Sequence, residues 1–361
     1  MEYRYYITGT IAIIALQLFL FSFSKTIAWL FNLSAKARKA LTITTFFLIN
    51  GLVVLHLTRT VTLFRPMAFV LVLLLFAFFI SFLTACIYKL SQGNPTVNRW
   101  LKICYPFAYL GLIALSFYNA YTPTVVHYSV KLDKPLAQPL RIGVASDLHL
   151  GQLFGAKQLD KLADIFNQEK VDLILLPGDI MDDNVSAYRA ANMQPHLAKL
   201  KAPLGVYATL GNHDFFGDQE SIAQEITAAG ITVLWDQAVE IDGKFTIIGR
   251  NDDLVKDRPS TEKLLQGVNT SLPVFLLDHR PTEIEKHAKL PIDIQTSGHS
   301  HKGQVFPADI ITKLIYRLDY GYEKIGFGHY FVTSGYGFWG VPMRLGSQSE
   351  VMIIDVEGKN P

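Results

Sequence analysis

Four long apolar stretches in the first third of the chain constrain the fold more than any other feature. They run over Tyr5–Phe31, Leu41–Leu63, Met67–Leu90 and Ile103–Tyr121. Each is close to the ~20 residues that a helix needs to cross the hydrocarbon core of a bilayer. Helices buried in a water-soluble core are the alternative, but four segments with almost no interior charge suit such a core poorly. We therefore predict a membrane domain of four transmembrane helices over residues 1–121.

The first stretch could instead be a cleaved signal peptide. Its amino-terminal flank has only Arg4 as a basic residue, and no small-residue cleavage site follows it, so we expect the helix to be retained. The stretches contain no array of carboxylates or lysines of the kind that lines transport pathways. We expect the helices to act as an anchor, and a groove that binds lipid or presents substrate is the alternative.

Basic residues in the short loops predict the orientation of these helices. The first and third loops hold an excess of them, Lys36, Arg38, Lys39, Lys89, Arg99 and Lys102, against Arg4, Arg59 and Arg65 in the amino-terminal tail and second loop. Such an excess marks cytoplasmic loops. Four crossings would then place everything after Tyr121 outside the cytoplasm, so we expect an extracytoplasmic domain on a bacterial inner membrane.

The rest of the chain has the polarity of a soluble α/β domain. Residues 122–139 contain three prolines and are predicted to be an extended linker, and residues 140–361 the domain itself. Strands are predicted at Arg141–Ser146, Leu173–Leu176, Val206–Leu210, Thr246–Gly249, Val274–Leu277 and Ile292–Ser297, with helices at Gln158–Glu169 and Ser221–Ala229. The domain has no cysteine and no basic stripe, and the net charge is +2, so neither a disulfide framework nor nucleic-acid binding is expected.

Five short motifs in this domain combine carboxylate, imidazole and amide side chains. In chain order they are Asp147-Leu148-His149, Gly178-Asp179-Ile180-Met181-Asp182, Gly211-Asn212-His213-Asp214, Asp278-His279 and Gly298-His299-Ser300-His301. Most of them follow a predicted strand, and open α/β sheets bind ligands beyond the carboxyl ends of their strands. Each motif alone is weak, because a single Asp-x-His or Gly-Asp turn is usually a cap or a surface loop. Together they predict one site.

The residue types and spacings indicate that this site binds metal. Residues two apart in an extended segment point the same way, so both side chains of Asp-x-His or His-x-His would reach the metals. Oxygen and imidazole ligands without thiolate suit Mn, Fe, Zn or Ni. Two divalent ions held in this way can activate water and hold a phosphate group. No Walker loop or Ser-His-Asp arrangement competes, so the motifs predict a two-metal phosphoesterase.

The motif set resembles that of the calcineurin-like metallophosphoesterase superfamily, whose pattern is D-x-H, G-D-x-x-D, G-N-H-D/E, H and G-H-x-H in this order. The resemblance extends from about Leu140 to the carboxyl terminus and implies a four-layer α/β/β/α sandwich. Two stretches, Leu277–Pro281 and Gly335–Leu345, are similar to a bacterial membrane-associated branch. That branch includes phosphodiesterases related to UDP-2,3-diacylglucosamine pyrophosphatases.

Residue by residue, the resemblance implies seven metal ligands. Asp147, His149 and His301 would bind one ion, Asn212, His279 and His299 the other, and Asp179 would bridge the two. His213 would contact the phosphate and protonate the leaving oxygen, with Asp214 orienting it and Asp182 supporting the turn at Asp179. Mn is the first expectation for both ions, and Fe, Zn or Ni are the alternatives.

Three further residues are candidates for contact with substrate. Lys302 stands where the branch commonly has glycine, so it would add charge at the rim. Asn251 and Asp252 are candidates for lining the site, but an exposed turn is favoured for them. The segment Pro307–Leu318 has apolar residues at helical spacing, which fits either packing on a sheet or an interfacial helix on the bilayer.

The sequence as a whole predicts a membrane-anchored phosphoesterase or pyrophosphatase for a lipid-linked or envelope substrate, with the bilayer as its partner. A pyrophosphatase for a nucleotide-activated glycolipid of the UDP-diacylglucosamine type is the first alternative. That substrate is normally made on the cytoplasmic side, which conflicts with the predicted orientation. A sensor that binds metal or lipid without turnover is the alternative from another class. The oligomeric state is open.

Overall fold

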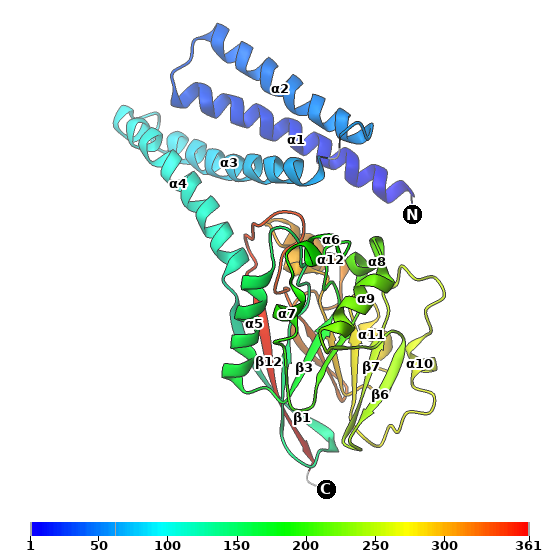
Figure 1. Cartoon of the computed structure of the whole chain (residues 1–361). Coiled ribbons are helices and arrows are strands. Elements are labelled where there is room, and N and C mark those ends of the chain that lie inside the picture. The colour runs from blue at the N-terminus through cyan, green and yellow to red at the C-terminus, as the bar shows by residue number, and fades with distance from the viewer. Residues whose placement is uncertain (1, 62, 360–361) are drawn as a thin grey trace. The chain divides into compact units, whose positions relative to one another are not determined.

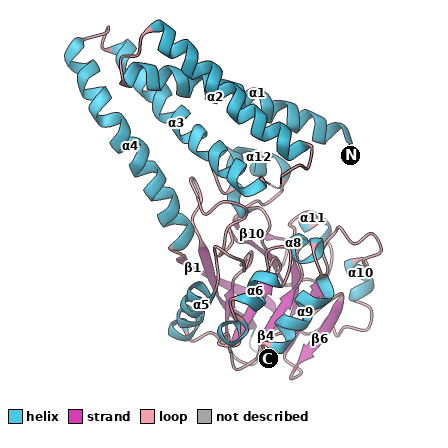
Figure 2. Ribbon diagram, turned by 45° about the horizontal axis from the view of Figure 1, so that its top comes forward, coloured by secondary structure: helices cyan, strands magenta, loops and turns pink. Residues whose placement is uncertain are grey.

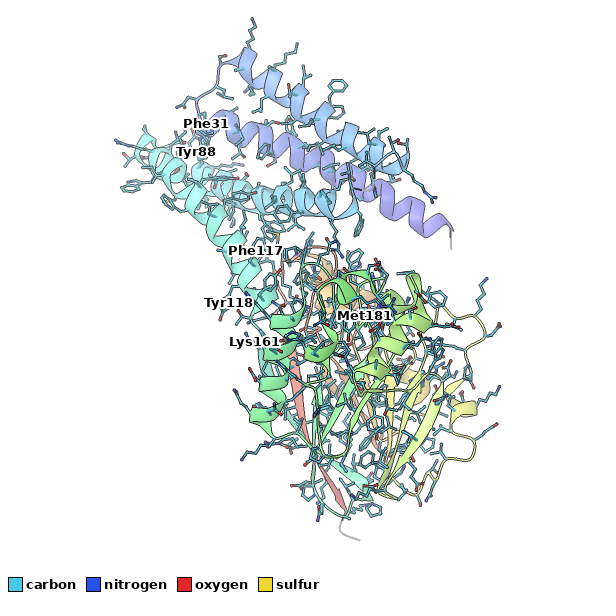
Figure 3. All side chains as sticks on the ribbon, viewed as in Figure 1. Phe31, Tyr88, Phe117, Tyr118, Lys161 and Met181 are labelled. Carbon is cyan, nitrogen blue, oxygen red and sulfur yellow. The ribbon has the colours of Figure 1, made fainter. Side chains whose placement is uncertain are left out.

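The computed structural model describes residues 2–61 and 63–359, and its contacts divide the chain into two compact units. The membrane unit spans residues Met1–Phe117, and the C-terminal unit spans Tyr118–Pro361. Figure 3 labels Phe117 and Tyr118, the two residues at this boundary. Because the boundary falls within one helix, the last residues of that helix are part of the C-terminal unit.

The membrane unit contains long helices in place of all four predicted apolar stretches (Figure 1). They are α1 (Glu2–Leu30), α2 (Ala35–Leu57), α3 (Phe64–Leu90) and α4 (Pro95–Tyr121), the last of which continues into the C-terminal unit. All four are long and apolar enough to cross a membrane. Large apolar side chains such as Phe47 and Phe107 are about 70% exposed, which water would penalise and lipid does not.

Polar side chains join the membrane helices to one another. Gln17 of α1 donates to Asn50 of α2 at 2.9 Å, and Thr26 of α1 lies 2.7 Å from Ser81 of α3. The Tyr105 hydroxyl of α4 lies 3.0 Å from the Ser81 hydroxyl, so Ser81 is hydrogen-bonded to both α1 and α4. Such interhelical hydrogen bonds stabilise helix packing where lipid supplies no hydrophobic drive.

Two six-stranded sheets form the centre of the C-terminal unit (Figure 2). The first has the order β1 (Thr124–Pro135), β12 (Glu350–Lys359), β2 (Leu140–Val144), β3 (Leu173–Pro177), β4 (Val206–Thr209) and β5 (Thr232–Val233). The second has the order β10 (Gly321–Ile325), β11 (Gly328–Val332), β9 (Ile294–Ser297), β8 (Val274–Asp278), β7 (Phe245–Arg250) and β6 (Gln237–Ile241). In the first sheet β2, β3, β4 and β5 run parallel to one another, and in the second sheet β7, β8, β9 and β11 do. The carboxyl ends of the parallel strands of each sheet therefore lie on a common edge.

The predicted four-layer sandwich is confirmed. Ile142 and Leu173 of the first sheet pack against Ile247, Phe275 and Leu277 of the second in a core between the sheets. The outer face of the first sheet is covered by α5 (Ala156–Glu169), α7 (Gln194–Leu197) and α9 (Gln219–Ala228). The outer face of the second contacts residues of α10 (Thr261–Leu264) and α11 (Ile284–His287). The short helices α6 (Ser186–Ala190), α8 (Asn212–Phe216) and α12 (Ala308–Ile315) lie in the connecting segments.

The predicted linker, residues 122–139, is wrong for most of its length. Thr124–Pro135 forms β1, which pairs in parallel with β12 from Thr124↔Glu350 onward. Tyr121, just before it, also belongs to the domain, because its hydroxyl donates to the Leu153 carbonyl and its ring stacks on Phe154. The domain therefore starts at the end of α4 and not at Leu140.

Candidate metal centre

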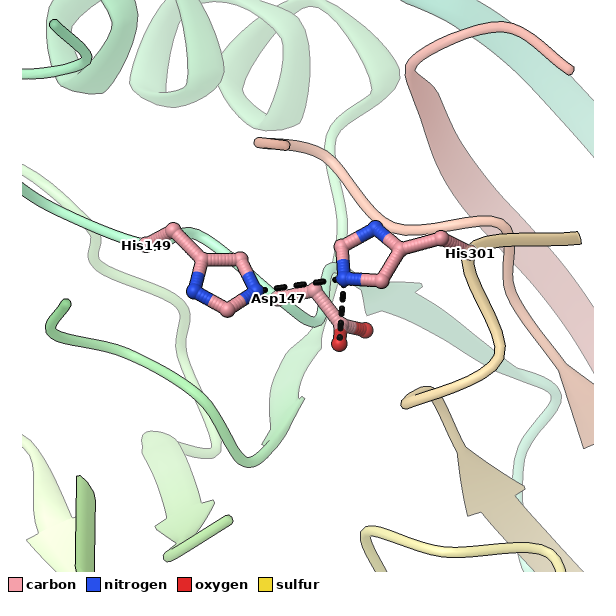
Figure 4. A group of neighbouring side chains, drawn as sticks. All are labelled: Asp147, His149 and His301. Atoms are coloured by element: carbon pink, nitrogen blue, oxygen red, sulfur yellow. Dashed lines mark hydrogen bonds and ion pairs between the residues drawn. The ribbon is translucent and has the colours of Figure 1, made fainter. Parts of the chain in front are cut away.

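Three of the predicted ligands, Asp147, His149 and His301, lie together beyond the ends of β2 and β9. The Nε2 atoms of His149 and His301 are 3.1 Å apart, and His301 Nε2 lies 3.4 Å from Asp147 Oδ1. Figure 4 shows the two imidazole rings with these nitrogens turned toward each other above the Asp147 carboxylate. The three side chains present a common set of donor atoms, each within 4.8 Å of the others.

A second group, Asp179, His279 and His299, adjoins the first. Asp179 Oδ2 is 3.1 Å from His279 Nε2 and 3.8 Å from His149 Nε2. Its carboxylate therefore stands between the two groups, where a bridging ligand must be. Asn212, which precedes His213, is buried at the start of α8.

Several buried atoms at this centre have no hydrogen-bond partner. Such atoms are expected where side chains bind metal ions. They are His149 Nδ1, Asn212 Oδ1 and His279 Nε2. His279 Nδ1 faces the Pro177 carbonyl at 2.8 Å, so it carries the proton and leaves Nε2 with a free lone pair. Leaving such groups buried and unpaired is costly. The donor set therefore fits two divalent cations, as the family chemistry requires, and the identity of the ions stays a prediction.

The pKa values of three of the four histidines agree with this assignment, whereas Asp179 outweighs burial at His279 and raises its pKa to about 10 in the absence of a cation. Burial lowers the pKa of His149 to about 3, and it lowers the pKa values of His299 and His301 as well. Neutral imidazole is the form that binds metal. Asp147 and Asp179 are at most 1% exposed, and buried carboxylates need compensating positive charge.

The backbone at the centre differs from the extended segments that the motif spacing predicted. Asp147, His149, Asp179, His299 and His301 all have positive φ angles, between 44° and 66°. The side chains of Asp-x-His and His-x-His therefore reach the centre from left-handed turns, and the argument from strand alternation was wrong.

The motif glycines are required by close packing against the carboxylates. A Cβ atom on Gly211 would lie 2.2 Å from Asp179 Oδ1, and one on Gly298 would lie 2.1 Å from Asp147 Oδ2. Atoms at these separations overlap, so any larger residue at either position would displace a predicted ligand.

The structure corrects the roles of two carboxylates near His213. Asp183, and not Asp214, accepts from His213 Nδ1 at 2.6 Å. Asp214 is buried and instead accepts from the backbone N–H groups of Ile180 and Met181, so it holds the turn at Asp179 that was assigned to Asp182.

Asp182 takes a place beside the metal centre. Its Oδ1 atom lies 3.9 Å from His149 Nδ1, and its carboxylate belongs to a cluster with Asp183 and His213. Burial by itself would lower the pKa of His213, but the hydrogen bond to Asp183 and the nearby Asp179 outweigh it and raise this pKa above its ordinary value.

The three predicted substrate contacts are also corrected. Asn251 and Asp252 are buried and not in an exposed turn. Asn251 bonds to Gln219, and Asp252 accepts from Arg280 Nε at 2.8 Å. Both side chains are therefore engaged by other residues of the domain. Lys302 turns to Tyr320, with its Nζ 4.3 Å from the ring centre, and not to the metal centre.

Two arginines beside the site were not assigned from the sequence, although both lie in the quoted stretches. Arg280 follows the ligand His279, and its charge helps to lower the pKa of His299. Arg344 is fully buried, and its Nη2 donates to the carbonyls of Ser334, Gly335 and Gly337 and lies 3.1 Å from His301 Nδ1. Only the tertiary fold brings Arg344 to His301, so residue spacing gave no signal for it.

Comparisons with known proteins bear on the family of this domain. Residues 140–320 match the family model of the calcineurin-like phosphoesterases. A metallophosphoesterase of Aquifex aeolicus is 33% identical over 68% of this chain and 96% of its own length. One from Helicobacter pylori is 30% identical over 75% of this chain and 74% of its own. A zebrafish (Danio rerio) transmembrane protein with a metallophosphoesterase domain is 30% identical over 64% of this chain and 57% of its own.

Proposed function

The chain belongs to the calcineurin-like phosphoesterase family and is a metal-dependent phosphoric ester hydrolase of the membrane, and we propose that its substrate is a lipid-linked phosphoester or pyrophosphate. The observation that carries this proposal is the apolar border of the site. Phe216 and Trp339 have rings 5.4 Å and 6.0 Å from the His213 ring, and they are 59% and 44% exposed. Acyl chains of a lipid would be stabilised by contact with such a border.

The residues of the centre have distinct tasks in this reaction. Two divalent cations, Mn²⁺ by our first proposal, would supply the Lewis acid that activates water and neutralises phosphate charge. Asp147, His149 and His301 would hold one of them, and Asn212, His279 and His299 the other, with Asp179 between. Asp214 fixes the Asp179 turn through two backbone hydrogen bonds.

His213 is the proposed proton donor to the leaving oxygen. Its side chain is 13% exposed, so one edge of the ring is accessible from solvent. Its Nδ1 is hydrogen-bonded to Asp183, which leaves Nε2 to carry the proton that is transferred. Asp183 is a positioning residue, because it acts on the substrate only through His213.

The helix α12 extends the apolar surface of the C-terminal unit. Ile310, Ile311, Leu314 and Ile315 are all at least 51% exposed on it. Of the two expectations for this segment, packing on a sheet is therefore wrong for these side chains. We propose that α12 lies in the headgroup region of the bilayer, where exposed isoleucine and leucine are stabilised by burial in the acyl boundary. The unit would then meet its substrate in the membrane.

The orientation remains part of the proposal. The excess of basic residues in the first and third loops favours a cytoplasmic location for both, and an extracytoplasmic C-terminal unit on a bacterial inner membrane. A UDP-diacylglucosamine-type pyrophosphatase is the second candidate, favoured by the Leu277–Pro281 stretch. It requires a cytoplasmic site. Alkaline phosphatase and green fluorescent protein fused to the carboxyl terminus distinguish the two orientations.

The proposal is tested with full-length protein in detergent with Mn²⁺. The panel consists of a soluble diester, a monoester, lipid phosphates in micelles and a nucleotide-diphospho-glycolipid, with Asp179→Ala as the inactive control. We expect selective turnover of one lipid substrate. Turnover of the soluble esters alone would refute the lipid proposal. Metal binding without turnover of any member, together with an unchanged phenotype for His213→Ala in cells, would favour the sensor.

A pair of variants tests the apolar border directly. Trp339→Ser should raise KM for the micellar substrate several-fold and leave KM for the soluble diester unchanged, because only the lipid uses the border. Leu254→Ser is the matched control, since Leu254 is also exposed but lies in the loop after β7. Equal effects on both substrates would contradict a role in lipid recognition.

A further inference from the structure

The membrane unit contains a polar pocket that the hydrolase site does not use. It has a volume of about 340 Å³ and lies among α1, α3 and α4, with Lys25, Trp29, Tyr88, Asn98 and Lys102 in its lining. This volume falls within the range of roughly 300–1,000 Å³ that is usual for small-molecule sites. Trp29 lies in the last turn of α1 and Tyr88 in the last turn of α3, so the pocket is at the ends of these two helices.

The lining is preorganised by hydrogen bonds between helices. Trp29 Nε1 donates to Asn98 Oδ1 at 2.9 Å, which ties α1 to α4. Lys102 Nζ donates to Asn32 Oδ1 at 2.5 Å and lies 5.5 Å from the Trp29 ring centre. Asn32 and Trp29 therefore hold the Lys102 ammonium group in the pocket. A lysine that extends to the membrane surface would have its ammonium group in water instead.

The charge of the pocket is not compensated within its own unit. Glu2 is the only acidic residue among residues 1–117. It lies in the same helix as Lys25 but about 35 Å away at 1.5 Å per residue. Neither Lys25 nor Lys102 has a carboxylate partner among the described residues of the membrane unit. Five further basic residues lie near the ends of α2, α3 and α4, namely Lys36, Arg38, Lys39, Lys89 and Arg99.

We propose that the Lys25–Lys102 pocket binds a phosphate-bearing anion, which an acidic phospholipid headgroup or free phosphate can supply. Two ammonium groups and the N–H groups of amide side chains offer charge and hydrogen bonds to phosphate oxygens. Basic pockets between transmembrane helices on the cytoplasmic side are suited to anionic headgroups. The site is separate from the metal centre, because all its lining residues belong to the membrane unit.

Native mass spectrometry of the full-length protein in detergent tests the proposal. The probes are dioleoyl phosphatidylglycerol, dioleoyl phosphatidylcholine and inorganic phosphate. We expect phosphatidylglycerol to bind more tightly than phosphatidylcholine. The double variant Lys25→Gln/Lys102→Gln should weaken phosphatidylglycerol binding by about tenfold or more. The reason is that the loss of one charge-assisted hydrogen bond already corresponds to about a tenfold change in Kd. Displacement of the lipid by millimolar phosphate would identify the phosphate group itself as the ligand, and resistance would identify the lipid form.

Two further variants keep the result interpretable. Lys36→Gln/Lys39→Gln removes the same charge from the start of α2 and should leave binding within about twofold of wild type, as expected for exposed charges. Lys25→Arg/Lys102→Arg keeps the charge and should retain most of the binding, which excludes misfolding as the cause of the loss. Equal loss in the Lys36/Lys39 variant, or equal binding of phosphatidylcholine, would overturn the proposal.

Discussion

At the scale of single residues, the metal centre is built from backbone conformations that cost free energy. Five of its predicted ligands have positive φ, which costs non-glycine residues about 1–3 kcal/mol each. The flanking strands β2, β3 and β9 are buried and hold these turns in place. The ligand geometry therefore depends on the sheets and on the glycines that let segments approach.

Gly298→Ala should abolish metal binding at the group around Asp147. The added Cβ would overlap both Asp147 Oδ2 and Ser146 Oγ, at 2.1 and 2.2 Å. We expect the metal content measured by plasma mass spectrometry to fall by at least one ion per chain, with loss of diester hydrolysis. Gly111→Ala is the control, because nothing lies within 4 Å of its Cβ position. Full metal content in Gly298→Ala would contradict the assignment of Asp147.

Asp183→Asn should shift the alkaline limb of the pH–rate profile to lower pH. The hydrogen bond and charge of Asp183 raise the pKa of His213, so their loss lowers it. His213 must be protonated to act as an acid, and activity is lost as pH rises through its pKa. The measurement is kcat for a soluble diester between pH 5 and 10. An unshifted limb with a lower kcat would assign Asp183 a purely structural role.

The sequence predicted which residues form the metal centre better than it predicted their hydrogen-bond partners. All five motifs meet at one rim, because strand ends on a common edge bring distant loops together. The roles of Asp182 and Asp214 were misassigned and Asp183 was given none, because three carboxylates in two adjoining turns are equivalent in sequence. Only the direction in which each turn leaves its strand decides which of them faces His213.

At the scale of elements, β1 is the clearest failure of sequence-based prediction. Its three flanking prolines and weak alternation indicate a linker, yet it pairs along its length with β12. The pairing partner lies at the other end of the domain, so no local pattern could reveal it. The longer buried strands and the membrane helices were predicted well, because each carries its signal within its own residues.

The junction between β7 and α11 contains an ion-pair network that should make stability depend on pH. Glu283 contacts Arg250 at 2.6 Å and Arg258 at 3.3 Å. Burial raises the pKa of Glu283, but the hydrogen bond and charge of Arg250 outweigh this and lower it from 4.5 to about 2. The ionised form therefore stabilises the fold above about pH 4.5, and this contribution is lost as pH falls toward 2.

Glu283→Gln should accordingly lower Tm at pH 6, and the difference from wild type should shrink as pH falls from 4.5 to 2. Thermal unfolding followed by circular dichroism measures both proteins under identical conditions. Glu285→Gln is the matched control, since it removes a neighbouring carboxylate outside this pair of arginines. A difference in Tm that stays constant down to pH 2 would contradict the lowered pKa of Glu283.

At the scale of the whole molecule, the two units have separate cores. Both large cores of the C-terminal unit consist of residues from Ala120 onward, and the small core of the membrane unit lies within α1–α3. Under the proposals above, the membrane unit anchors the hydrolase and has a phosphate-binding pocket of its own.

A fragment of residues 118–361 should therefore fold without the membrane helices and hydrolyse soluble diesters. Its rate on vesicle-bound substrate should fall by about tenfold or more, because tethering raises the effective concentration at the membrane. A fragment of residues 140–361 is the comparison. It lacks β1 and should aggregate, since one edge of β12 is then unpaired. A soluble, active 140–361 fragment would show that β1 is dispensable.

The position of β12 between β1 and β2 sets the order of events during biosynthesis. Thr124 and Ser349, which are hydrogen-bonded beside the β1–β12 pair, are 225 residues apart. At about 5–20 residues per second, the ribosome reaches β12 roughly 10–45 seconds after β1. Until then β1 has no partner and the first sheet cannot close. The membrane helices can insert during translation, whereas the hydrolase can mature only after β12 has left the ribosome.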